Sequence, residues 1–108
     1  MARDIVTVGP ELIRLPRRSA NSHKGDYGRL FILAGSRGYT GAAALCARSA
    51  VRGGAGLVTL AVPEDIYPIA AMKCDEAMVW PWPGDDEAVL EKAKGCDAAL
   101  IGPGLGQG

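Results

Sequence analysis

The chain has 108 residues, a length that fits one small domain or part of a larger one. Its 48% apolar and 22% charged residues are ordinary for a folded chain, which excludes extensive disorder. Twelve basic and twelve acidic residues leave no net charge and aromatic residues are scarce, so we expect neither a nucleic-acid partner nor a membrane partner.

The first part of the chain, residues 1–28, is predicted to be an irregular lead-in. Residues 10–15 predict one short helix, because Pro10 suits a first helical turn. Pro16 ends that helix, since the residue before a proline is pushed out of the α region. Residues 17–21 are then a polar connector.

From Arg29 onward, patterns typical of strands and helices alternate. Residues 30–34 form a continuous apolar run, which is typical of a strand buried on both faces. The alanine-rich residues 41–52 predict a helix that packs closely on a sheet, and Gly53 and Gly54 predict its end.

The same alternation continues through the second strand. Residues 57–62 predict that strand, and residues 64–72 a second helix that Pro63 opens. Residues 77–80 predict a short third strand, followed by a tight turn over residues 81–84.

The last two predicted elements complete an α/β pattern over residues 29–108. Residues 85–94 predict a third helix with acidic residues in its first turn, and residues 98–101 a fourth strand. Alternating strands and helices predict right-handed βαβ crossovers and a mostly parallel sheet.

The chain stops directly after the fourth strand and its glycine-rich loop. No helix follows to cover that strand, although parallel sheets normally have both faces covered. We therefore expect residues 1–108 to be the N-terminal part of one larger domain. Its exposed apolar sheet surface would be covered by missing sequence or by another copy of the chain.

Three cysteines and the N-terminus indicate a cytoplasmic location. Cys46, Cys74 and Cys96 are odd in number, widely spaced and without a CxxC pair, which favours reduced thiols over a metal site or a disulfide. Residues 1–6 contain no long apolar segment of a secretory signal. The longest apolar stretches, such as residues 57–62, are too short to span a bilayer.

Two glycine loops are the candidate ligand-binding segments. Residues 35–41 and 102–106 each follow a predicted strand, and ligands of open α/β sheets bind beyond the carboxyl ends of strands. Thr40 is a predicted N-cap whose hydroxyl serves the following helix or a ligand. In the first loop, Gly35, Gly38 and Gly41 form a GxxGxxG pattern without the GxGxxG fingerprint or the GK[ST] ending of a P-loop, which disfavours a classical NAD-binding site. The alternative, that these are simply turn glycines, stays open at this point.

Five segments, residues 23–29, 33–36, 38–43, 47–59 and 101–106, resemble the opening of the NAD(P)H-hydrate dehydratases in order and spacing. The resemblance extends over nearly the whole chain. It implies a ribokinase-like domain, Rossmann-like with three layers, of which this chain is a part. It also implies a lyase that repairs hydrated NADH or NADPH and uses ADP or ATP with Mg²⁺. Phosphorylation of the substrate hydroxyl would turn it into a leaving group.

The resemblance also implies where the substrate binds. Ala42 and Gly104 are the strongest candidates, and the full set is Tyr39, Thr40, Gly41, Ala42, Gly102, Gly104, Leu105 and Gly106. The family's catalytic aspartate lies in a GxGD motif, and this sequence has none. We therefore expect no catalytic residue, no metal ligand and no nucleotide-binding segment here, and no activity of this piece alone. The resemblance further implies a homo-oligomer.

Two other functions remain open from the sequence. One is a fragment of another ribokinase-like kinase acting on a vitamin precursor or a sugar, and the other is a non-catalytic module for nucleotide binding or assembly. Arg37 is either a pyrophosphate contact or an exposed loop residue. His23 and Lys24 either contact a phosphate or order the entry to the first strand. Trp80 and Trp82 are expected to pack inside the domain or against a missing or neighbouring part.

Overall fold

In the part of the chain that the computed structural model describes, residues 7–12 and 28–106, four strands form one sheet. All the pairings are parallel, and the order across the sheet is β3-β2-β1-β4. The predicted α/β fold with a parallel sheet is therefore confirmed. The strands are β1 (Arg29–Leu33), β2 (Leu57–Pro63), β3 (Met78–Trp82) and β4 (Ala98–Ile101).

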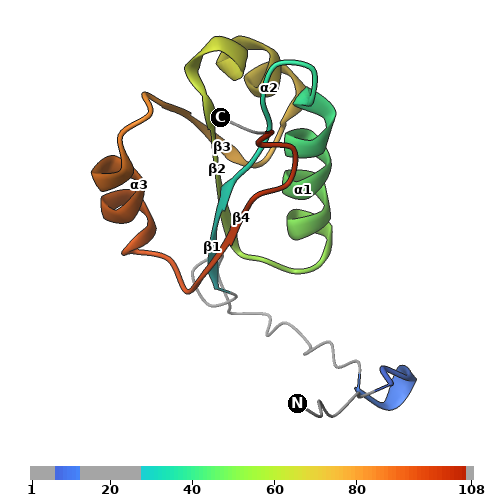
Figure 1. Ribbon diagram of the computed structural model, residues 1–108. Helices are drawn as coiled ribbons and strands as arrows, with labels where there is room; N and C mark the ends of the chain where they lie inside the picture. Colours follow the sequence, from blue (N-terminus) through green and yellow to red (C-terminus); the bar gives the residue numbers. More distant parts are fainter. Residues whose placement is uncertain (1–6, 13–27, 107–108) are drawn as a thin grey trace, which may run out of the picture.

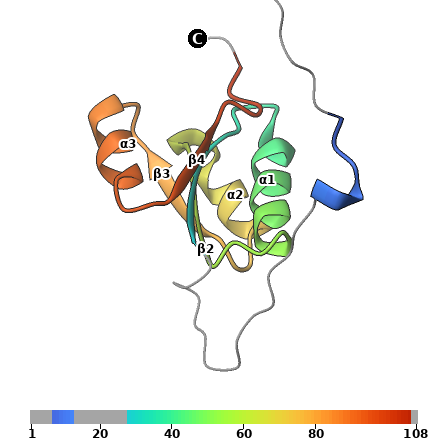
Figure 2. The ribbon, with the colours of Figure 1, turned by 90° about the horizontal axis from the view of Figure 1, so that it is seen from below.

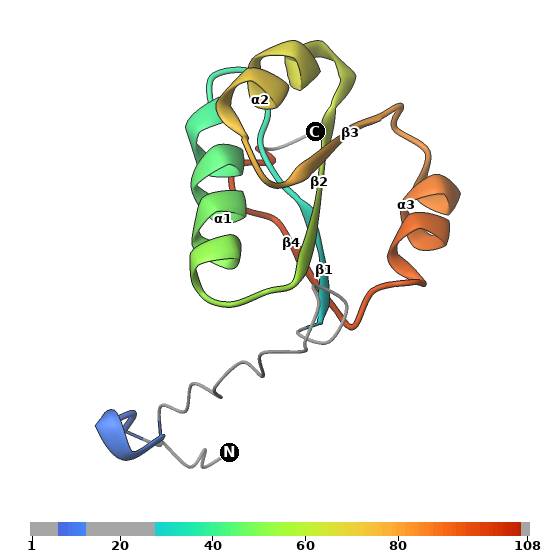
Figure 3. The ribbon, with the colours of Figure 1, turned by 180° about the vertical axis from the view of Figure 1, so that it is seen from behind.

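Helices cover both faces of this sheet. Helices α1 (Thr40–Arg52) and α2 (Tyr67–Lys73) lie side by side on one face, and α3 (Asp86–Ala93) lies on the other (Figures 1 and 2). The view from behind shows the same separation (Figure 3). The helices thus complete the three layers expected for this class of fold.

From Leu30 to Leu33, strand β1 is apolar, and its last three residues are buried between the two helical layers. Ile32 packs into the core beneath α1 and α2, and Phe31 and Leu33 pack into the core beneath α3. Successive side chains of a strand point to opposite faces, so a strand between two helical layers has no position for a polar residue.

Residues directly beside the helices determine where α1 ends and where α3 begins. After α1, Gly53 donates its N–H to the carbonyl of Ser49, and Gly54 takes a φ of +109° that favours glycine. Before α3, the carboxylate of Asp85 accepts a hydrogen bond of 3.0 Å from the N–H of Glu87. The predicted glycine stop is confirmed, and Asp85 caps the helix rather than belonging to it.

The predicted helix over residues 64–72 is instead two short pieces. A 3₁₀ turn, η3 (Glu64–Ile66), precedes α2, and Pro68 is the second residue of α2. Proline has no N–H, so Pro68 cannot donate to the carbonyl of Glu64, and a continuous helix is interrupted there.

The predicted turn over residues 81–84 begins too early. Pro81 and Trp82 belong to β3, where they pair with Val62 and Pro63 of β2. A proline is tolerated in this strand because β3 lies at the edge of the described sheet, where its missing N–H leaves no broken pair on the outer side.

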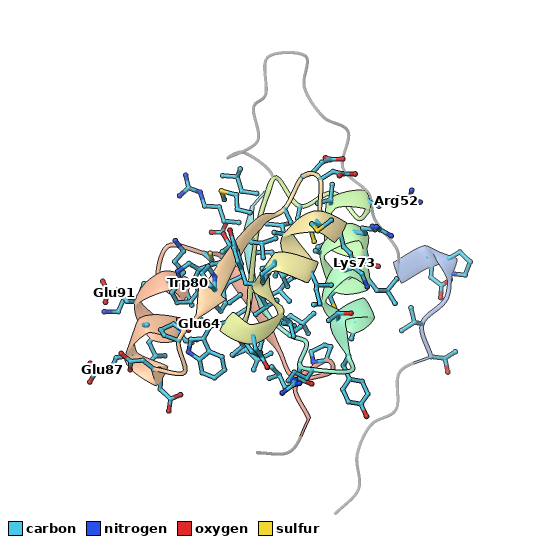
Figure 4. The ribbon with its side chains drawn as sticks, turned by 90° about the horizontal axis from the view of Figure 1, so that it is seen from above. Arg52, Glu64, Lys73, Trp80, Glu87 and Glu91 are labelled. Carbon is cyan, nitrogen blue, oxygen red and sulfur yellow. The ribbon has the colours of Figure 1, made fainter. Side chains whose placement is uncertain are left out.

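Both tryptophans pack inside the described part of the chain, which confirms the first of the two expectations for them. Trp80 and Trp82 are half-buried against the cluster that contains Phe31 and lies under α3, and Figure 4 shows Trp80 on that side. Lys92 of α3 lies over the ring of Trp80, with its Nζ 5.6 Å from the ring centroid. These contacts join α3 to the edge of the sheet.

The N-terminal predictions are tested only in part. Residues 10–15 were expected to be helical, and a 3₁₀ turn, η1 (Pro10–Leu12), is present there. Residues 13–15, Pro16 and the connector over residues 17–21 lie outside the described residues, as do His23 and Lys24.

Strand β4 leaves apolar side chains exposed. All four of its residues are exposed, with Leu100 at 41% and Ile101 at 59% of their reference surface. The exposed apolar surface that the sequence predicts is therefore present, and it lies at the β4 edge.

Replacing Leu60, which is fully buried in β2, with alanine should lower the free energy of unfolding by about 2–5 kcal/mol because it leaves a cavity. The matched control is Leu90→Ala in α3, where the side chain is 64% exposed, and its effect should stay within about 0.5 kcal/mol. Urea unfolding of the product of the complete reading frame measures both. Equal effects of the two variants would contradict the described core.

Candidate functional site

The pairing of β1 with β4 brings the two glycine loops together. Leu33 and Ile101, the last residues of the two strands, are aligned partners in the parallel register. The loops that follow therefore leave the sheet side by side at the carboxyl ends of the two strands, as Figure 1 shows near the label of the C-terminus. The N–H of Gly35 donates to the carbonyl of Pro103 at 2.9 Å, and the N–H of Gly102 donates to the carbonyl of Leu33 at 3.1 Å.

Gly104 lies so close to the first loop that no side chain fits there. A Cβ at this position would lie 2.7 Å from the Cβ of Ala42 and 3.1 Å from the Cβ of Tyr39. The φ of Gly104 is +68°, a conformation that L-residues rarely adopt. Glycine is therefore required here for two independent reasons. The two residues named as strongest candidates, Ala42 and Gly104, are in direct contact.

Ser36 fastens the second loop to the first. Its hydroxyl donates a hydrogen bond of 2.7 Å to the carbonyl of Gly104, and this contact is partly buried. Ser36 is not among the site residues predicted from the sequence. The available signal was a small polar residue directly after the glycine that ends a buried strand, but its partner lies 68 residues further along the chain.

The predicted N-cap role of Thr40 is wrong. Thr40 is the first residue of α1, and the N-cap position belongs to Tyr39, whose side chain makes no capping hydrogen bond. The Thr40 hydroxyl instead accepts a hydrogen bond of 3.1 Å from the ammonium group of Lys73 in α2. Among the described residues, no side chain caps the start of α1, so its first N–H groups remain available to an anion.

An open hollow of about 420 Å³ lies between the two loops and the end of β2. It contains three of the predicted site residues, Tyr39, Leu105 and Gly106. Its other lining residues are Ser36, Arg37, Pro63 and Asp65.

The hollow carries one positive and one negative side chain. Arg37 Nε lies 3.9 Å from Asp65 Oδ2, and the two side chains are 87% and 52% exposed. A pair this exposed contributes little to stability and is free to exchange its partner for a ligand group. The expectation that Arg37 is an exposed loop residue is therefore confirmed.

Two of the other predicted residues, Gly41 and Gly102, do not line this hollow. Gly41 and Gly102 have open space where a Cβ would be, so the backbone there is accessible to a ligand. Leu105 also packs against the core that contains Phe31, which anchors the end of the second loop. The structure thus brings together all the predicted residues except the side chain of Thr40, which points to Lys73.

A second, smaller hollow of about 150 Å³ lies between the end of α1 and the residues just before β3, at the amino ends of the strands. Arg48, Arg52 and Cys74 are among its lining residues. Burial raises the pKa of the Cys74 thiol above its ordinary value, and the guanidinium of Arg48 only partly opposes this effect. The thiol therefore stays protonated at neutral pH and is a poor nucleophile.

Within residues 7–12 and 28–106, no three His, Cys, Asp or Glu side chains gather in a way that would hold a metal ion. No helix there has the length and apolar character needed to cross a membrane. Cys46, Cys74 and Cys96 are all free thiols.

The sheet, its helical layers and the glycine loops define a ribokinase-like α/β protein. A ribokinase-like superfamily protein from Enterococcus faecalis superposes with a TM-score of 0.72 at 33% identity, over 85% of this chain and 32% of that one. The family model described as NAD(P)H-hydrate dehydratase matches residues 30–108. The chain belongs to the NAD(P)H-hydrate dehydratase family.

Relatives with known activities match the same region. An ADP-dependent (S)-NAD(P)H-hydrate dehydratase from Staphylococcus aureus is 39% identical over 94 residues, which are 87% of this chain and 34% of that protein. The ADP/ATP-dependent NAD(P)H-hydrate dehydratase from Bacillus subtilis, co-crystallised with ATP and Mg²⁺, superposes with a TM-score of 0.69 at 35% identity. The match covers 87% of this chain and 34% of the Bacillus protein. The chain spans between 19% and 34% of the length of the curated relatives that it matches first.

Gly104→Ala should lower the free energy of unfolding by about 2–5 kcal/mol, because strain at positive φ adds to the overlap with Ala42. The matched control is Gly84→Ala, where φ is +97° and a Cβ would meet nothing within 4 Å. That control should lose only about 1–2 kcal/mol.

The double variant Gly104→Ala with Ala42→Gly should recover part of the difference, because it removes the nearest clashing atom. Urea unfolding of the wild type, Gly104→Ala, Ala42→Gly and the double variant gives the coupling free energy. Purely additive effects would contradict the contact between the two loops.

Proposed function

We propose that this chain is the N-terminal part of one NAD(P)H-hydrate dehydratase domain and supplies part of the site for hydrated NADH or NADPH. The observation that carries the proposal is the contact between Gly104 and Ala42, which joins the two loops at the edge where such sheets bind ligands. The family membership and the relatives' activities support the same conclusion.

The described residues are suited to bind and orient a substrate. The first turn of α1 offers uncapped N–H groups, and the glycines of residues 102–106 let a ligand approach the backbone closely. Tyr39 and Leu105 add apolar surface to the hollow, and Arg37 adds a positive charge beside it. This arrangement fits a ligand that combines a ring system with phosphate groups.

The same residues do not provide acid–base chemistry. The hydroxyl of Ser36 is engaged with Gly104 and that of Thr40 with Lys73, and the nearest carboxylate, Asp65, is paired with Arg37 on the exposed rim. We therefore propose that the catalytic residue lies in another part of the domain.

The nucleotide is also proposed to bind elsewhere. The Staphylococcus relative is ADP-dependent, and the Bacillus relative was co-crystallised with ATP and Mg²⁺. The described residues hold no cluster of carboxylates that fits Mg²⁺. ADP or ATP with Mg²⁺ is thus a cofactor proposed for the whole domain, and no step through it is assigned to these residues.

The exposed face of β4 fits a domain with more sheet than the described part. We propose that further polypeptide of the same domain covers Leu100 and Ile101, because buried parallel strands are normally covered on both faces. The small share of each relative that this chain spans supports this proposal. Cytoplasmic location and self-association stay predictions.

The product of the complete reading frame should convert hydrated NADH to NADH only when ADP or ATP with Mg²⁺ is present. The near-ultraviolet absorbance of the restored dihydronicotinamide measures the conversion. The control reaction omits the nucleotide. Phosphorylation of a vitamin alcohol or a sugar without dehydration of the hydrated cofactor would refute the proposal in favour of a kinase. A protein with neither activity would favour a binding or assembly module.

A further inference from the structure

The hydrogen bond between Ser36 and Gly104 differs from the other contacts between the loops. Among the hydrogen bonds of residues 28–106, it is the one in which a side chain of one loop meets the other loop. The other two loop contacts are backbone bonds that Gly35 and Gly102 make close to the ends of β1 and β4. The hydrogen bond from Ser36 is thus the one that joins the first loop to the middle of the second loop, at Gly104.

We propose that Ser36 is a positioning residue that holds residues 102–106 in the geometry that accepts the substrate, an inference that rests on the proposed function. Ser36 acts through the peptide group of Gly104. A peptide group is planar, so fixing the carbonyl of Gly104 also fixes the direction of the N–H of Leu105. That N–H donates to the carbonyl of Gly102 at 3.1 Å and closes the turn.

This arrangement leaves backbone donors for a ligand. The carbonyl of Gly104 is taken by Ser36, and the N–H of Leu105 is taken by Gly102. The N–H groups of Gly104 and Gly106 have no partner among the described residues. The N–H of Gly104 shares its peptide plane with the carbonyl of Pro103, which accepts from Gly35. Two donors on one short loop can recognise an oxygen of a bound molecule.

The loop gains order from such a contact because three of its five residues are glycines, and only Leu105 packs against a core cluster. Gly102, Gly104 and Gly106 all have positive φ, and none has a side chain that packs. Glycine-rich segments lose the most conformational entropy when they become ordered. If the loop is already ordered before the substrate binds, the binding free energy does not have to offset the entropy lost on ordering it. The affinity is then higher than for a disordered loop.

Ser36 also lies where it can act on the hollow. It is one of the residues that line the hollow, and its Oγ is 3.5 Å from the position that a Cβ on Gly106 would occupy. The same hydroxyl therefore lies next to two successive glycines of the loop. Displacing it would loosen the loop on the side that faces Tyr39 and Arg37.

The test compares Ser36→Ala with the wild type in the product of the complete reading frame. The KM for hydrated NADH should rise about 5–10-fold, as expected when one hydrogen bond is lost, while the KM for ADP stays unchanged. Ser36→Thr keeps the hydroxyl and should restore most of the lost affinity. Ser49→Ala is the matched control, because Ser49 is exposed and lies in the last turn of α1, at the opposite end of the helix from the two loops.

Hydrogen exchange of the amides in residues 102–106 provides a readout that does not depend on activity. Exchange should be about 5-fold faster in Ser36→Ala than in the wild type, and unchanged in Ser49→Ala. Unchanged exchange, or faster exchange with an unchanged KM for hydrated NADH, overturns the positioning role. A wild type without dehydratase activity refutes the proposed function before any variant is compared, and exchange then still decides whether Ser36 holds the loop.

Discussion

The parallel pairing of Leu33 with Ile101 determines where the site forms. Both residues end their strands, so the two loops that follow must leave the sheet at the same edge. The pairing itself depends on β1 being apolar on both faces, because only a fully buried strand is flanked by neighbours on each side and by helices above and below. A shift of the β1–β4 register by one residue would move the ends of the two strands apart and so separate the two loops.

Close approach of the loops then explains which residue types they contain. Gly104 has no room for a Cβ, and Gly35 has a Cβ position only 2.9 Å from the Cβ of Ala43. Small residues at the start of α1 let the helix lie directly beneath the second loop. The result is a site built mainly from backbone groups, which suits recognition of a charged, ring-containing ligand. The other hollow, at the amino ends of the strands, is lined by side chains that include Arg48 and the protonated thiol of Cys74.

The sequence predicts the sheet well because its signals are local. Continuous apolar runs mark β1 and β2, and Gly54 and Asp85 mark helix ends through their own backbone and side chain. Contacts between distant residues carry no such signal. The hydroxyl of Thr40 is taken by Lys73 of another helix, and Ser36 meets a carbonyl 68 residues away, so both roles depend on the folded arrangement. Which ligand contacts each loop residue was implied by resemblance and stays a prediction.

The most direct test of the account is a crystal structure of the product of the complete reading frame with hydrated NADPH bound. The dinucleotide should lie against residues 102–106 and the first turn of α1, in contact with the backbone of Gly104 and with Ala42. Binding at another edge of the sheet, such as the hollow beside Arg48 and Cys74, with the two glycine loops left free, would contradict the account.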